Sequence, residues 1–149
     1  MNNWLLRRWR EKLAGSCCVL IAVLTGLFAR GAAADGNSPH VDYMLHCQGC
    51  HLPGGVGYPG LVPNMQGHIG VFLRSEAGRA YLIQVPGAAQ SDLDDAELAA
   101  VLNWMLSEFD PGNVKSDFKR FTGPEVTAYR ATHLDDVGAT RRALLAEQN

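Results

Sequence analysis

Apolar residues recur at intervals of three and four positions in the second half of the chain. They are Leu98, Val101, Leu102, Met105 and Leu106. This spacing places all five side chains on one face of a helix. Acidic residues crowd the start of the stripe, where the helix dipole favours negative charge, and Asp110-Pro111-Gly112 ends it. The pattern therefore predicts an amphipathic helix with one buried face.

Shorter helical segments are predicted on both sides of this helix. They are a helix that begins at Ser38-Pro39 and leads into Cys47, one over residues 74–84, one that begins at Thr122 to Glu125, and one over residues 141–147. A proline near the first helical position supports the first and the third of them. Residues 114–120 are predicted to be a loop. The sequence as a whole predicts an all-α fold.

The first 34 residues have the composition of a secretory signal peptide. Their leading basic residues are Arg7, Arg8, Arg10 and Lys12. An uncharged apolar run over 17–28 follows, and alanines at 32–34 supply a cleavage pattern, which would leave Asp35 as the first mature residue. This interpretation places the mature chain in the bacterial periplasm. Two alternatives stay open, an uncleaved membrane anchor over 13–29 and a twin-arginine signal at the paired arginines.

The charge balance changes at the same boundary. The 149-residue chain has a formal charge of −2, but its first 34 residues hold five of the 13 basic residues and one of the 15 acidic ones, which leaves −6 for the rest. No basic face for nucleic acid remains in that part of the chain. An acidic surface suits a protein partner with a basic patch. The length allows one small domain beside the signal peptide.

Two cysteines three positions apart carry the chemical signal of the chain. Cys47 and Cys50 are followed directly by His51, whereas Cys17 and Cys18 belong to the signal peptide. Residues three apart share a helix face, so both thiols can reach one edge of a haem and the next histidine can bind its iron. A thioredoxin-like dithiol would open a helix after a strand, and a zinc site would need a second ligand pair downstream. The motif therefore predicts one covalently attached haem c with His51 as the axial iron ligand.

Over residues 38–109 the chain resembles the class I cytochromes c. Tyr43 matches the aromatic residue of their first helix, and residues 62–70 resemble their Gly-Pro-Asn-Leu-type loop on the proximal side of the haem. Residues 93–104 resemble their closing helix. The resemblance implies a helical fold around one haem with an exposed edge. It also predicts that Tyr43 contacts Trp104 where the first and closing helices cross.

The same resemblance assigns a supporting residue and divides the chain. It implies that the carbonyl of Pro63 accepts a hydrogen bond from His51 and so orients the iron ligand. It ends at about Phe109, which separates a cytochrome domain over 35–109 from a C-terminal helical extension over 110–149. The extension is interpreted either as a segment packed on the cytochrome body or as a docking element for a larger dehydrogenase.

The sequence departs from the family where the sixth iron ligand is expected. The loop before the closing helix, residues 85–90, contains neither methionine nor histidine. Met65 is then the best-placed thioether, although its position matches a packed leucine, and His68 lies in the same loop. Met105 is assigned to packing, and an open or water-bound position is the remaining alternative.

These features together predict an electron carrier rather than an enzyme. The leading hypothesis is an exported mono-haem cytochrome that passes single electrons between redox proteins, either as a soluble carrier or as the cytochrome subunit or acceptor of an envelope dehydrogenase. The competing hypothesis is a haem protein with an open coordination position that binds small gases or peroxide. Association with the membrane is expected only if the N-terminal segment stays uncleaved.

Overall fold

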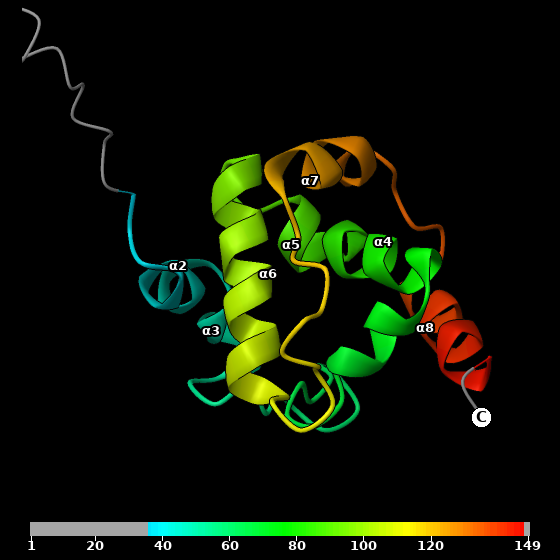
Figure 1. The fold of residues 1–149 in the computed structure, drawn as a ribbon. Helices are drawn as coiled ribbons and strands as arrows, with labels where there is room; N and C mark the ends of the chain where they lie inside the picture. The colour runs from blue at the N-terminus through cyan, green and yellow to red at the C-terminus, as the bar shows by residue number, and fades with distance from the viewer. Residues whose placement is uncertain (1–35, 148–149) are drawn as a thin grey trace, which may run out of the picture. The chain divides into compact units, whose positions relative to one another are not determined.

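The computed structural model describes residues 36–147 and shows a bundle of helices (Figure 1). The elements are α2 (Pro39–His46), α3 (Gln48–His51), the 3₁₀ helix η1 (Gly70–Arg74), α4 (Glu76–Gln84), α5 (Pro86–Ala89), α6 (Asp95–Phe109), α7 (Gly123–Arg130) and α8 (Val137–Ala146). No strand occurs in this part of the chain apart from an isolated bridge between Tyr58 and Val62. The predicted all-α fold is therefore confirmed. The predicted signal peptide lies outside the described residues.

The predicted amphipathic helix is α6, which spans 15 residues. Asp94 caps its start by accepting hydrogen bonds from the backbone N–H groups of Ala96 and Glu97, both at 2.8 Å, and the Glu97 carboxylate accepts one from the Asp94 N–H at 2.8 Å. This capping box satisfies donors that the first turn of a helix leaves free. All five residues of the predicted apolar stripe are buried. The helix supplies one side of the core.

The end of α6 is fixed by a buried carboxylate. Asp110 is 2% exposed, and its carboxylate accepts hydrogen bonds from the Gly70 N–H and the Asn113 side-chain amide, both at 2.7 Å. A buried carboxylate needs such donors to compensate for lost hydration. The predicted stop at this residue is confirmed, and the contact ties the end of α6 to the start of η1.

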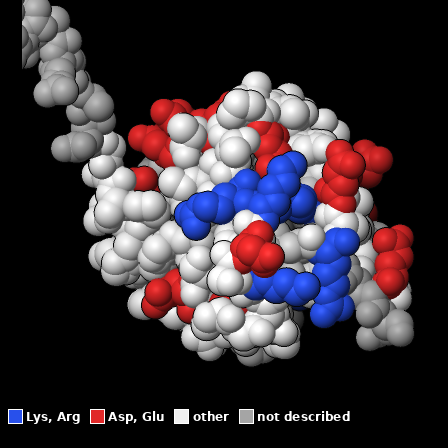
Figure 2. Space-filling model, in the orientation of Figure 1, with Lys and Arg blue, Asp and Glu red and all other residues white. Residues whose placement is uncertain are grey.

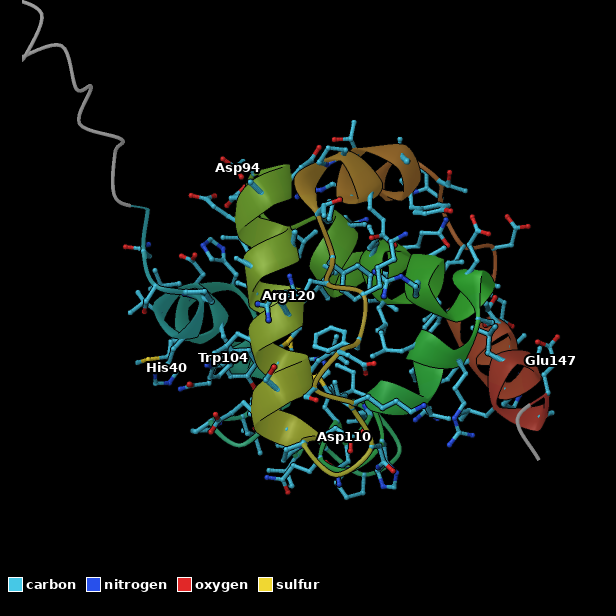
Figure 3. All side chains as sticks on the ribbon, viewed as in Figure 1. His40, Asp94, Trp104, Asp110, Arg120 and Glu147 are labelled. Carbon is cyan, nitrogen blue, oxygen red and sulfur yellow. The ribbon has the colours of Figure 1, made fainter. Side chains whose placement is uncertain are left out.

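Helix α2 crosses α6 through an aromatic cluster. Tyr43 is fully buried, and its ring centroid lies 5.2 Å from that of Trp104 and 5.2 Å from that of Phe109. The predicted contact between Tyr43 and Trp104 is confirmed. His40 stacks on the outer face of Trp104 with a centroid distance of 5.0 Å, and Figure 3 shows the two side by side.

Three predicted boundaries are wrong. The segment predicted as one helix over 74–84 is broken at Ser75, whose extended backbone and side chain begin α4. Residues 85–90, predicted as a loop, contain the short helix α5. The last helix begins at Val137 rather than at residue 141, because Asp136 caps it by accepting a hydrogen bond from the Ala139 N–H at 2.8 Å.

The C-terminal extension is joined to the rest of the fold by a buried ion pair. Arg79 of α4 is 8% exposed and donates to both carboxylate oxygens of Glu125 in α7, at 2.8 and 2.9 Å, and to the Lys119 carbonyl at 2.7 Å. Its guanidinium carbon lies 4.1 Å from the centroid of the Phe121 ring. Asn103 of α6 exchanges two hydrogen bonds with the backbone of Phe121, at 2.8 and 2.9 Å. These contacts fix the segment before α7 and the start of α7 on α4 and α6.

Within residues 36–147, no helix has the length and apolar character needed to cross a membrane.

Candidate functional site

A cavity of about 450 Å³ opens beside the cysteine motif. Its wall on the motif side includes Cys47, Cys50 and His51, together with Pro63 and Met65 from the following loop. Most of the remaining lining is apolar and comes from η1, α4, α5, α6 and α8. The structure therefore brings distant segments of the sequence together around the motif.

The motif forms a separate turn of helix. Cys47 interrupts the helical conformation between α2 and α3, with φ −123° and ψ −36°. Its carbonyl accepts hydrogen bonds from the N–H groups of Cys50 at 3.2 Å and His51 at 3.0 Å. This turn places both thiols and the imidazole beside one cavity, as the spacing predicts. Neither thiol is in a disulfide, and Cys47 is half-buried whereas Cys50 is exposed.

The environment of Cys47 does not favour a thiolate. Burial raises the pKa of its thiol to about 11, and the negative charge of Asp42 acts in the same direction. Reactive redox cysteines need the opposite, a pKa lowered by positive charge or by a helix N-terminus. A thioredoxin-like role is therefore disfavoured.

His51 presents a neutral imidazole to the cavity. Its Nδ1 atom is buried and has no hydrogen-bond partner among the described residues. Burial lowers the pKa of the ring, and the neighbouring backbone of Pro63 acts in the opposite direction without forming a hydrogen bond of good geometry. A buried, unpaired ring nitrogen is costly, and the Pro63 backbone is the neighbouring group that could accept a hydrogen bond from it. A haem held by the two cysteines fits this donor set, since its iron takes a neutral histidine as ligand.

The loop after His51 is held close to Pro63 by a glycine. Gly57 has φ +65°, and a Cβ atom on it would lie 2.3 Å from the Val62 carbonyl oxygen and 2.7 Å from that of Pro63. The Gly57 N–H also donates to the His51 carbonyl at 3.1 Å. Any side chain at this position would push Pro63 away from the motif. The glycine therefore allows the backbone of Pro63 to lie close to His51, as predicted.

Leu52, the residue directly after His51, has an unusual backbone. Its φ is 61° and its ψ is 166°, a region that side-chain-bearing residues rarely occupy. The buried Tyr43 hydroxyl donates to its carbonyl at 2.5 Å, and the Gly55 N–H donates to the same oxygen at 3.1 Å. Burial raises the pKa of Tyr43 to about 12, so the donor stays protonated at neutral pH. These bonds fix the direction of the chain immediately after the motif.

The candidates for a sixth iron ligand lie on the motif side of the cavity. Met65 is half-buried, and its N–H donates to the Gly55 carbonyl at 2.8 Å, so it belongs to the loop that follows His51. His68 is exposed at the edge of the same loop. Met105, assigned to packing by the sequence, is 7% exposed and also reaches the cavity from α6.

The wall formed by α4, α5 and α8 carries different chemistry. Tyr81, Ala88, Val137 and Arg141 line it, and none of its described lining residues is methionine, histidine or cysteine. The contribution of α8 was missed by the sequence analysis, which placed residues 110–149 outside the cytochrome domain. Val137 and Arg141 are four positions apart on a helix, a spacing that puts them on one face but does not say what that face covers.

A side chain of α7 holds the short connection between α5 and α6. Arg130 donates to the carbonyls of Ala89 at 2.9 Å, Leu93 at 2.7 Å and Ser91, and its guanidinium forms an ion pair with Asp95 at 3.1 Å. These contacts from one side chain fix the backbone between α5 and α6. The extension therefore helps to hold α5 and the α5–α6 connection, whose residues Ala88 and Ser91 line the cavity.

The chain is similar to two known proteins. A protein named cytochrome c-552 from one strain of Thermus thermophilus is 33% identical over 135 aligned positions, which cover 78% of this chain and 85% of the relative. A second cytochrome c-552 from Thermus thermophilus is 34% identical over 120 positions, covering 68% of this chain and 88% of the relative. No protein-family model matches the chain. The aligned part of the first relative covers 78% of the 149 residues, so the similarity to it reaches past Phe109.

Proposed function

The chain belongs to the class I cytochrome c family of electron carriers with covalently attached haem c, and we propose that its haem is bound through Cys47 and Cys50 with His51 as axial ligand. The observation that supports this assignment is that Cys47, Cys50 and His51 line one largely apolar cavity. A neutral imidazole beside two free thiols matches the ligand set of a c-type haem.

The residues of the site have separable roles in this proposal. The bound haem supplies a one-electron couple at its iron. Cys47 and Cys50 would hold the cofactor covalently, and the Pro63 carbonyl would keep the His51 ring in one orientation by accepting a hydrogen bond from it. The apolar lining from η1, α4 and α6 excludes water. Cys50 is exposed, so the attachment edge lies at the protein surface where an electron can enter or leave.

The sixth ligand decides between this function and a second candidate. The wall formed by α4, α5 and α8 has no methionine or histidine among its described lining residues, whereas Met105 reaches the cavity from α6. An open coordination position would bind small gases or react with peroxide. Met65 is the thioether candidate, but its tie to Gly55 supports packing on the side of His51. Electron transfer is the stronger proposal, because that wall offers no histidine or carboxylate as an acid–base group.

Export and redox partners belong to the same proposal. The basic and apolar segments within residues 1–34 support secretion to the periplasm, where cleavage would release the domain from the membrane. An uncleaved segment would anchor the domain in the membrane. The charge of −6 beyond residue 34 supports a partner with a basic patch, such as a dehydrogenase or another redox protein. Figure 2 shows lysines and arginines near the middle of the face in view, with acidic residues between and around them.

Covalent attachment is tested with cysteine variants of the full chain made in a host that matures c-type cytochromes. Cys47→Ala and Cys50→Ala should each weaken haem retention, and the double variant should lose haem staining after denaturing electrophoresis. Gln48→Ala, inside the same motif, is the control and should retain the stain. His51→Ala should alter the spectra of both oxidation states. Haem that stays with the double variant through denaturation would overturn the assignment.

A further inference from the structure

Arg141 is the one lysine or arginine among the described residues that line the cavity. It lies on α8, is half-buried, and its guanidinium carbon is 5.9 Å from the centroid of the Phe72 ring. Burial raises the pKa of the neighbouring Tyr81, and the positive charge of Arg141 partly opposes this effect. The guanidinium is therefore close enough to the cavity wall to act on groups inside it.

This guanidinium has no carboxylate partner within residues 36–147. The ion pairs of that region join Arg79 to Glu125 and Arg130 to Asp95. The adjacent Arg142 is exposed and lies outside the cavity lining, with its Nη1 atom 3.3 Å from the place that a Cβ on Gly138 would take. A half-buried cation beside an apolar cavity costs free energy unless an anion compensates it.

A c-type haem would bring such an anion. It carries two propionate carboxylates, and the described cavity wall has no lysine and no other arginine to receive them. A carboxylate and a guanidinium form the strongest common ion pair in proteins, with two parallel hydrogen bonds. A negatively charged propionate would therefore pair with the positive charge of Arg141, which has no carboxylate partner among the described residues.

We propose that Arg141 binds a haem propionate, so that helix α8 of the C-terminal extension is part of the cofactor site. This inference rests on the proposed haem site and gives the extension a role besides packing. Val137, one turn earlier on α8, also lines the cavity, and Leu144 anchors the helix in the core. Asp136, which caps the start of α8, and Glu147, which caps its end, are both exposed.

The test compares Arg141→Gln and Arg141→Lys with Arg142→Gln in the full holoprotein. The reduction potential of each is measured between pH 5 and pH 9. A cation near the haem favours the ferrous form, so Arg141→Gln should lower the ferrous-to-ferric ratio at a fixed potential by about three- to tenfold. The propionate pKa should also rise, which introduces a pH-dependent step that the wild type lacks. Arg141→Lys should restore most of both effects, and Arg142→Gln, with the same change in net charge, should show neither.

Two results would overturn the inference. One is an Arg141→Gln variant whose potential and pH profile match those of Arg142→Gln. The other is an unchanged pH profile together with weaker binding of azide to the ferric protein, which would assign Arg141 to an exogenous anion instead of a propionate. Haem staining after denaturing electrophoresis accompanies each measurement. If the Arg141 variants retain haem stain but their reduction potentials do not change, only the role of Arg141 is refuted. If the wild-type protein shows no haem stain, the proposed haem site itself is refuted.

Discussion

Glu125→Ala should weaken the attachment of the extension to the cytochrome body at a measurable cost in stability. The substitution removes two charge-assisted hydrogen bonds, at 2.8 and 2.9 Å, from a guanidinium whose side chain is 10% exposed. Breaking a buried pair by removing one partner costs about 3–5 kcal/mol. Arg79 keeps the Lys119 carbonyl at 2.7 Å and the Phe121 ring at 4.1 Å, so we expect the lower end, about 3 kcal/mol.

The assay is urea unfolding of the holoprotein followed by far-ultraviolet circular dichroism and by haem absorbance. Replacing both partners, as in Arg79→Met with Glu125→Leu, leaves no charge buried and should cost much less than the single change. Glu108→Ala, which removes an exposed carboxylate from α6, is the control. A loss below about 1 kcal/mol for Glu125→Ala would mean that the pair behaves like an exposed one, which would refute the reasoning.

Three further changes probe the site and its supports. Met65→Leu should cost less than about 1.5 kcal/mol and leave the spectrum unchanged if the residue only packs; loss of a methionine–iron charge-transfer band would show ligation. Trp104→Ala should cost about 3 kcal/mol in thermal or urea unfolding, because the half-buried indole contacts the core aromatic residues of α2 and α6; a change below about 1 kcal/mol would contradict this. Hydrogen bonds from Thr127 and Arg130 hold the pKa of Asp95 below its ordinary value of 3.8. The stabilisation is therefore present above pH 3.8 and lost as the pH falls through the folded pKa, so the difference in unfolding free energy between wild type and Asp95→Asn should shrink only in that acidic range. A difference that stays constant down to about pH 2 would contradict it.

The elements that the sequence predicted correctly are those determined by neighbouring residues. The capping box at Asp94, the apolar stripe of α6, and proline near the start of α2 and of α7 act within one or two turns of helix. The cysteine motif is equally local, which is why the turn that carries both thiols and His51 could be expected from spacing alone. The Tyr43–Trp104 contact was predicted through the family resemblance instead.

The elements that the sequence did not predict depend on contacts between distant segments. A Cβ on Gly78 would lie 2.2 Å from the Phe72 carbonyl oxygen, so the break at Ser75 reflects the close approach of η1 and α4. The part of α8 in the cavity wall was missed for a similar reason. Arg141 looks like any exposed arginine of an amphipathic helix until the fold shows what lies beside it.

The cavity joins the beginning of the described chain to its end, which bears on the order of biosynthesis. Cys47 and His51 are made long before Val137 and Arg141, and contacts between such distant positions close late in folding because the entropy of closing the loop opposes them first. An emerging chain therefore offers the motif in an unfinished half-pocket with room for a maturation enzyme. The last helix then adds its part of the wall, so a prematurely terminated chain would leave the cavity open on that side, a defect that proteolysis can recognise.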